Sequence, residues 1–203
     1  MTIVFDLFGV LLSSSFSSAQ EKLGLLLNRP IAEIAPVYRK WEADFDLGRI
    51  DAREFWQRVN TDLGTNIDWQ ELDSAVLNAI KPLPGSFALL QELQAHPLAL
   101  LSNTRREWYE QLDGRYHFSQ FFNAIFLSYQ LRLCKPDPRI YARVQQELSL
   151  PPQQILCIDD SAQNIAAAAA LGMPGILFTS ATKIRRELLK YISFDQCVKL
   201  ETQ

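Results

Sequence analysis

From residue 83 onward, short apolar segments alternate with segments of helical character, and no other feature of the sequence constrains the fold as strongly. The apolar segments have the length and residue content of buried strands, and they span 97–102, 123–128, 154–159 and 175–179. The helices are expected before each of these strands, over 86–95, 105–113, 137–148 and 161–171. Strands that are separated by helices of roughly ten residues pair in parallel. The pattern therefore predicts an α/β fold built on a parallel sheet.

The N-terminal run TIVFDLFGVLL (residues 2–12) supplies a fifth strand for this sheet. It consists of β-branched, aromatic and other apolar residues, interrupted by Asp6 and one glycine. A buried central strand that leaves the sheet at the acid has this composition. Residues 13–18, SSSFSS, are small and polar and predict a flexible hinge. We thus expect a Rossmann-like core of five parallel strands, formed by residues 1–12 and 83–203.

Between the first strand and the rest lies a stretch with helical periodicity and no strand pattern, residues 19–82. Apolar residues recur at spacings of three and four from Ile31 to Phe45. Asp51 is typical of an N-cap, because an acid follows it three residues later. A further helix is expected over 69–80. The sequence therefore predicts an all-helical domain, residues 13–82, inserted into the core.

Polar residues gather where the predicted strands end. Asp6, Ser102, Asp159 and Asp160 stand at the carboxyl ends of three strands, and Lys135 lies in the loop after a fourth. Ligands of open parallel sheets bind at this edge. Carboxylates held close together repel each other unless a cation joins them, and oxygen ligands suit Mg²⁺. A buried acid is costly unless it is paired or bound to metal, so the acid of the first strand is expected to be functional.

The composition excludes several classes of protein. With 20 basic and 23 acidic residues the formal net charge is −3, and no basic stripe of a nucleic-acid binder is present. The N-terminus lacks the basic region of a signal peptide, and no apolar segment reaches the roughly 18–20 residues of a membrane span. Cys134, Cys157 and Cys197 are scattered, which argues against a disulfide framework or a zinc site and for small buried side chains or bystanders. We expect a cytoplasmic protein without nucleic-acid or membrane partners.

Four segments, FDLFGVLL, LLSNT, CKPDPRIY and IDDSAQNI, follow each other in an order that resembles the motifs of the haloacid dehalogenase superfamily of hydrolases. The insertion is similar to the helical cap of the superfamily's first cap class. Within it, DLGRIDAREFW resembles the branch that includes sugar-phosphate phosphatases of the glucose-1-phosphate type. The resemblance implies hydrolysis of a small phosphorylated metabolite by a monomer or homodimer. It also implies a cap that closes by bending near residues 13–18 and 80–84.

Matching the first three motifs residue by residue implies the catalytic roles. Asp6 matches the aspartate that attacks phosphorus and forms an aspartyl-phosphate. Ser102 matches the hydroxyl that hydrogen-bonds the transferring phosphoryl group, with the amide of Asn103 as a helper. Lys135 matches the lysine that offsets charge between nucleophile and phosphate. Phosphoryl transfer depends mostly on positioning and charge neutralisation, which these residue types supply.

The fourth motif implies the Mg²⁺ site. Asp160 matches the principal magnesium-binding acid. Asp159 is expected either to bind the metal as well or to support the ligands without touching the metal. Asp6 and the backbone carbonyl of Phe8 match the remaining protein ligands. Asn164, one helical turn further on, is expected to orient Lys135 or Asp159 or to be a solvated helix residue.

Position 8 departs from the pattern, because most phosphatases of the superfamily carry a second aspartate there. Loss of such an acid–base group costs on the order of 10²–10⁴ in rate. Phe8 leaves three interpretations: a phosphatase that uses water or a cap residue instead, a dehalogenase, or a scaffold or phosphate-binding homologue. The dehalogenase branch carries an aromatic residue here, but it replaces the acids that IDDSAQNI keeps. It also needs a halide-binding arginine, for which Arg29 and Arg39 are available.

Substrate contacts are also expected from the inserted domain. Aromatic residues at helical spacing form a helical core more often than a ligand site. A cap that closes over a site must nevertheless present some side chains to the substrate, and Trp41, Phe45 and Arg39 are the first candidates.

Overall fold

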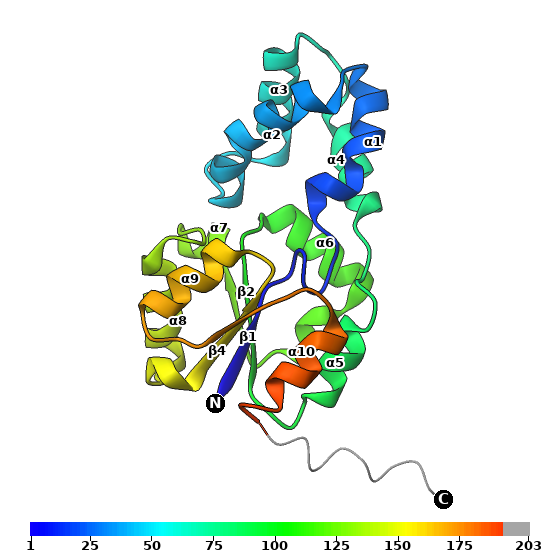
Figure 1. The fold of residues 1–203 in the computed structure, drawn as a ribbon. Coiled ribbons are helices and arrows are strands. Elements are labelled where there is room, and N and C mark those ends of the chain that lie inside the picture. Colours follow the sequence, from blue (N-terminus) through cyan, green and yellow to red (C-terminus); the bar gives the residue numbers. More distant parts are fainter. Residues whose placement is uncertain (193–203) are drawn as a thin grey trace, which may run out of the picture.

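The computed structural model describes residues 1–192. These form a parallel β-sheet covered by helices on both faces, with a further group of helices at its carboxyl edge (Figure 1). The strands are β1 (Thr2–Phe5), β2 (Leu98–Ser102), β3 (Ala124–Leu127), β4 (Ile155–Asp159) and β5 (Gly175–Leu177). They are all parallel and lie in the order β3-β2-β1-β4-β5. The predicted Rossmann-like sheet of five parallel strands is therefore confirmed.

Both faces of the sheet are buried, which explains why its central strands read as continuous apolar runs. Alternate residues of β1 point to opposite faces, so that Ile3 and Phe5 belong to one apolar cluster and Val4 to the other. The helices on the first face are α5 (Ser86–Glu92), α6 (Arg106–Tyr116) and α10 (Ala181–Leu188). The second face is covered by α8 (Pro138–Leu148) and α9 (Ala162–Ala170).

Between β1 and β2 the chain forms a separate group of helices at the carboxyl edge of the sheet (Figure 1). They are α1 (Ser15–Leu27), α2 (Ile31–Asp46), α3 (Ala52–Leu63) and α4 (Trp69–Ala79). We call this group the cap. The Asp51 side chain caps α3 by accepting a hydrogen bond from the Glu54 N–H at 2.7 Å, as the sequence predicts.

The prediction of a flexible hinge over residues 13–18 is wrong for its larger part, because α1 already begins at Ser15. Serine hydroxyls bond locally in several ways and are common at helix starts as well as in linkers. Here the Ser18 hydroxyl donates to Ser13 Oγ at 2.8 Å. The two chain crossings between core and cap also pair with each other: the Ser13 N–H donates to the Lys81 carbonyl at 2.8 Å, and the Leu83 N–H to the Leu11 carbonyl at the same distance.

The sequence did not predict the short helix α7 (Ser128–Leu131) or the helix α10. Cys157 is buried in β4 and Cys134 is half-buried, and both are free thiols, as expected; Cys197 lies outside the described residues. Among residues 1–192, no helix combines the length and apolar character that a membrane crossing requires.

Cap and core share one apolar cluster, and a buried acid fixes their contact. The Trp108 indole N–H, from α6 of the core, donates to Asp73 Oδ1 of α4 at 2.7 Å. The Trp56 indole N–H, from α3, reaches the same oxygen at 3.1 Å. Trp56 and Trp108 are completely buried, and Asp73 is the acceptor that satisfies both of their indole N–H groups.

Replacing this acceptor should destabilise the whole chain. We expect Asp73→Ala to lower the free energy of unfolding by about 2–4 kcal/mol, because two buried indole N–H groups lose their acceptor. Urea denaturation measures the change. Gln70→Ala, at an exposed position of the same helix, is the matched control and should stay within about 0.5 kcal/mol of wild type. Equal stabilities of the two variants would contradict the role of Asp73.

Candidate active site

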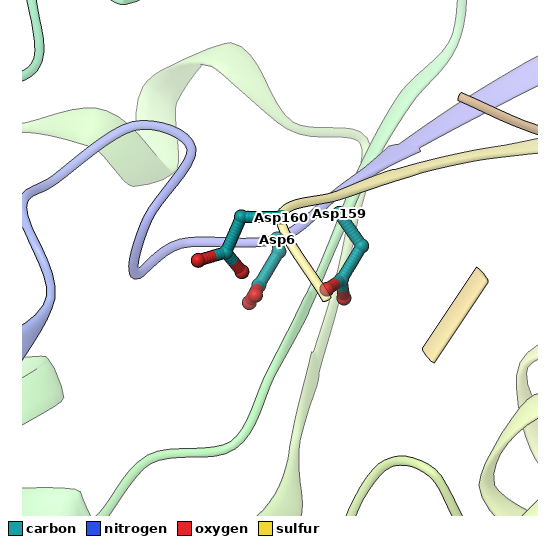
Figure 2. Close-up of side chains that lie close together, drawn as sticks. All are labelled: Asp6, Asp159 and Asp160. Carbon is teal, nitrogen blue, oxygen red and sulfur yellow. The ribbon is translucent and has the colours of Figure 1, made fainter. Parts of the chain in front are cut away.

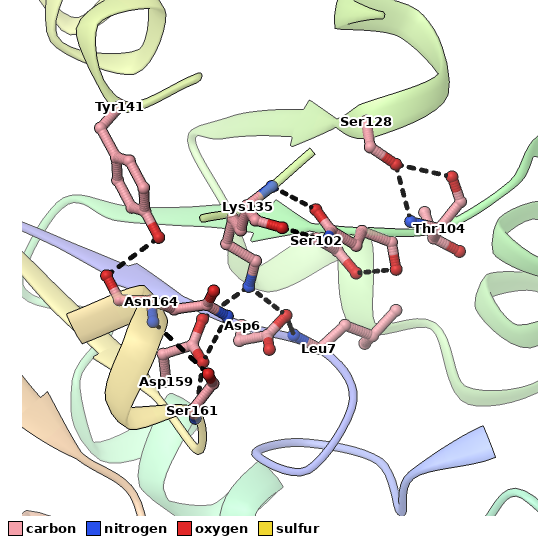
Figure 3. A network of polar contacts seen from close by, with 11 residues as sticks. Asp6, Leu7, Ser102, Thr104, Ser128, Lys135, Tyr141, Asp159, Ser161 and Asn164 are labelled. Atoms are coloured by element: carbon pink, nitrogen blue, oxygen red, sulfur yellow. Dashed lines mark hydrogen bonds and ion pairs between the residues drawn. The ribbon is translucent and has the colours of Figure 1, made fainter. Parts of the chain in front are cut away.

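The sheet order brings the predicted strand-end residues together. β1 lies between β2 and β4, so Asp6, Ser102 and Asp159 stand at neighbouring strand ends. Lys135 reaches the same place from the loop after α7 (Figure 3). Asp160 follows β4 directly, and the three carboxylates face one another (Figure 2).

Lys135 is the buried cation of this site. Its Nζ lies 2.8 Å from Asp6 Oδ1 and 2.6 Å from Asp159 Oδ2, and only 3% of the side chain is exposed. Burial opposes the positive charge, but attraction to Asp6 and Asp159 outweighs it and raises the pKa of Lys135. The lysine therefore stays charged and holds the two strand ends together.

Asn103 fixes the loop that carries this lysine. Its Nδ2 donates to the Lys135 carbonyl at 2.9 Å, and its Oδ1 accepts from the Lys135 N–H at 2.8 Å. These two bonds use only one of the two Nδ2 hydrogens, so the predicted role of the Asn103 amide in phosphate binding stays a prediction. Within residues 1–192, Ser102 Oγ makes a single long contact of 3.4 Å, to the Asn103 carbonyl, and its phosphate-binding role stays a prediction.

Asp159 and Asp160 differ in their surroundings. Asp159 Oδ1 accepts from the Ser161 N–H and from Asn164 Nδ2, both at 2.9 Å, while Oδ2 faces Lys135. Asn164 therefore orients Asp159, one of the two partners expected for it. Asp160 is exposed, and among the described residues its carboxylate makes no hydrogen bond or ion pair with another side chain. Gly9 lies against it with φ +81°, and a Cβ there would come within 2.0 Å of Asp160 Oδ2, so that only glycine fits.

The three acids form a donor set that fits a divalent cation. Asp6, Asp159 and Asp160 each offer an oxygen, and these atoms lie within 4.8 Å of one another. Burial, together with the neighbouring acids and against the pull of Lys135, raises the pKa of Asp6 to about 7. Burial and Asp159 likewise raise the pKa of Asp160. Carboxylates whose ionisation is opposed first by burial and then by neighbouring acids are stabilised in their charged form by a hard cation such as Mg²⁺. The ligand role of the Phe8 carbonyl stays a prediction.

A second polar cluster, which the sequence analysis missed, lies between α2 of the cap and the loop after β2. The buried Arg105 donates to the carboxylate of Asp46 and, at 3.1 Å, to the Tyr38 hydroxyl. Its guanidinium stacks over Trp108, 3.4 Å from the ring centroid, and lies 4.3 Å from that of Phe45. No motif marks these residues, because the contact joins positions 59 residues apart.

The predicted cap contacts have other surroundings. Trp41 contacts two residues of α3. Its indole N–H donates to Asp62 Oδ2 at 2.9 Å, and Arg58 lies 4.5 Å from its ring centroid. Phe45 is fully buried and stacks on Phe55, in the core of the cap. The substrate role of Trp41 stays a prediction. Arg39 is exposed and makes no hydrogen bond or ion pair within residues 1–192, and its substrate role stays a prediction.

Fold and site together define an α/β protein of Rossmann-like topology, whose polar centre consists of carboxylates and a lysine at the carboxyl edge of a parallel sheet. The chain belongs to the haloacid dehalogenase-like hydrolase family, which it matches over residues 1–172.

Curated relatives include enzymes named for phosphate ester hydrolysis. Flavin mononucleotide hydrolase 1 of Arabidopsis thaliana is 28% identical over 71% of this chain, but the match spans only 59% of that protein. A sesquiterpene phosphatase of Aspergillus oryzae is 23% identical over 93% of this chain and 95% of its own length.

Solved structures share the fold. A family enzyme of Bacteroides thetaiotaomicron, in complex with magnesium and inorganic phosphate, has a TM-score of 0.72, with 21% identity and coverage of 88% of this chain and 94% of its own. The L-2-haloacid dehalogenase of Xanthobacter autotrophicus, with chloropropionic acid covalently bound, has a TM-score of 0.66, with 22% identity over 94% and 82% of the two chains.

Metal binding at the three acids can be measured without any substrate. We expect Mg²⁺ to raise the melting temperature of the protein by roughly 2–8 °C, because it binds the folded state only. Asp160→Asn should abolish this shift. In the absence of metal the variant should melt no lower than wild type, since it relieves repulsion from Asp159. Glu147→Gln, an exposed position on α8, should keep the full shift. An undiminished shift in Asp160→Asn would contradict the assignment of this ligand.

Proposed function

We propose that the protein is a Mg²⁺-dependent phosphatase that hydrolyses a small phosphorylated metabolite through a covalent phosphoryl group on Asp6. The observation that carries the proposal is the buried lysine between two strand-end carboxylates, with a third carboxylate beside them. The names of the phosphatase relatives support it, as does the family enzyme crystallised with magnesium and phosphate.

The hydrogen bonds of Asp6 select the attacking atom. Oδ1 accepts from the Leu7 N–H at 2.7 Å and faces Lys135 Nζ, whereas no described residue donates to Oδ2. Oδ2 is then the oxygen that attacks phosphorus, and Lys135 and the Ser102 hydroxyl neutralise and orient the phosphoryl oxygens. Mg²⁺, bound by the three acids, supplies the remaining positive charge that phosphoryl transfer needs.

Phe8 favours a second candidate, a haloacid dehalogenase, because halide leaves without a proton and a phenylalanine cannot supply one. The retained pair Asp159 and Asp160 favours the phosphatase, since a metal-free dehalogenase has no use for a crowded set of acids. A phosphate-binding homologue without turnover is the third candidate.

Substitution of the nucleophile gives the first test of activity. Phosphate release is measured from para-nitrophenyl phosphate and from sugar 1- and 6-phosphates, with Mg²⁺ and with EDTA. We expect release that depends on Mg²⁺ and that falls by at least about 10³-fold in Asp6→Asn, because the covalent route is lost. Asp68→Asn, at the N-cap of α4, is the matched control and should keep wild-type activity, since asparagine caps helices equally well.

Other outcomes decide between the candidates. Residual activity of Asp6→Asn within tenfold of wild type would contradict its role as nucleophile. Halide release from a 2-halo acid in the presence of EDTA would establish the dehalogenase. A wild-type protein that releases neither product, but whose melting temperature rises with phosphate, would be the binding homologue.

A further inference from the structure

The strand edge holds no group that is free to protonate a leaving alcohol. Asp6 is the proposed nucleophile, Lys135 is held between two carboxylates, and both oxygens of Asp159 have partners. Asp160 belongs to the crowded acids that fit the cation, and Phe8 carries no proton. An alkoxide leaves readily only when it receives a proton as its bond to phosphorus breaks. The proton for an alkyl phosphate must therefore come from another element.

The helix α2 is the element that reaches this edge from the cap. It descends toward the carboxyl ends of the strands and α7 (Figure 1). Its last residue, Asp46, bonds to Arg105, which follows Ser102 by three positions. The Asp46 carbonyl also accepts from the Ser128 hydroxyl at 2.6 Å. The C-terminal turns of α2 are thus fixed over the phosphate-binding side of the site.

Glu42 lies one turn before Asp46, on the same side of this helix. It is half-buried, yet within the described part of the chain it makes no hydrogen bond and no ion pair. Its charge acts on Arg105 of the core and on the Cys134 thiol, the residue before Lys135. A carboxyl that is partly withdrawn from water and has no partner is costly, and such groups are found at functional sites.

We propose that Glu42 is the general acid and base of the reaction, in place of the acid that position 8 lacks. The proposal rests on the phosphatase function proposed above. As Asp6 Oδ2 bonds to phosphorus and the ester P–O bond breaks, the Glu42 carboxyl gives its proton to the ester oxygen and the alcohol leaves. The Glu42 carboxylate then takes a proton from a water molecule that attacks the aspartyl-phosphate. This second step releases inorganic phosphate, frees Asp6 and returns Glu42 to its protonated form.

The surroundings of Glu42 suit both steps. Burial and the neighbouring Asp46 raise the pKa of Glu42 to about 7, against the opposing pull of Arg105 and Arg39. A group with a pKa near the working pH can donate a proton and then accept one. Asp46 is no substitute, because its carboxylate is bound to Arg105. Burial raises the pKa of the Tyr38 hydroxyl far above neutrality, so it does not exchange protons in this range.

Leaving groups of different basicity test the proposal. The variant is Glu42→Gln, which keeps the size of the side chain and removes its proton exchange. Its matched control is Glu33→Gln, an exposed position on the same helix. For an alkyl phosphate that wild type hydrolyses, we expect kcat/KM of Glu42→Gln to fall by about 10²–10³-fold. With para-nitrophenyl phosphate, the first equivalent of nitrophenolate should appear at close to the wild-type rate, followed by slow turnover, because only the second step then needs Glu42.

The pH profile separates catalysis from a structural role. With the alkyl phosphate, wild-type kcat/KM should decline above a pH of about 7, as Glu42 loses its proton. This decline should be absent in Glu42→Gln and retained in Glu33→Gln. Glu42→Asp, which keeps an acid on a shorter side chain, should retain more activity on the alkyl phosphate than Glu42→Gln.

Three results would overturn the proposal: an activity of Glu42→Gln within about twofold of wild type on the alkyl phosphate, an equal loss on both substrates without a burst, or a loss in Glu42→Asp as large as in Glu42→Gln. Each of them leaves the phosphatase function standing, since wild type still turns over. A wild-type protein that hydrolyses neither ester would instead remove the proposed function, and the role of Glu42 with it.

Discussion

The candidate site depends on the charge of Lys135, because without it Asp6 and Asp159 could not be buried so close together, with the exposed Asp160 beside them. Its ammonium group lies between Asp6 and Asp159, which follow two adjacent strands, and so it couples β1 to β4. A single cation does not offset three carboxylates, and the pKa values of Asp6 and Asp160 are raised first by burial and then by repulsion from the neighbouring acids. The site therefore has a deficit of positive charge, which a bound divalent cation would offset.

Paired polar and charged groups also join the cap to the core. Arg105 is paired there with Asp46, and Asp73 accepts from two indole groups, whereas the half-buried Glu42 has no partner among the described residues. These contacts and the shared apolar cluster restrict how the cap can move, because wide opening would expose Trp108 and separate buried charges. The paired crossings at Ser13 and Lys81 restrict it further. Substrate entry by small adjustments at the cap edge costs less than rotation of the whole cap.

The sheet and most of the candidate site could be predicted from the sequence. Buried parallel strands are recognisable as apolar runs, and the topology brings their carboxyl ends to one edge. Asp6, Ser102, Lys135 and Asp159 were found in that way. The direction of a side chain on the cap depends on packing between helices, which periodicity does not fix. The contact of Trp41 with Asp62 could not be predicted for this reason. Serines occur both in linkers and at helix starts, and for this reason the hinge predicted over residues 13–18 was wrong for the part that belongs to α1.

The position of the proton donor has a consequence for how the protein distinguishes substrates. An acid next to the nucleophile acts on any ester that reaches the sheet edge, whereas Glu42 is held by the cap and acts only where the leaving group lies against α2. The Arg105–Asp46 pair fixes α2 to the loop of Ser102, so the cap acid and the phosphate-binding hydroxyl keep one spacing. Only a leaving group of matching size places its ester oxygen beside both. Selectivity would then arise in the chemical step, through alignment of a proton, and not in binding alone.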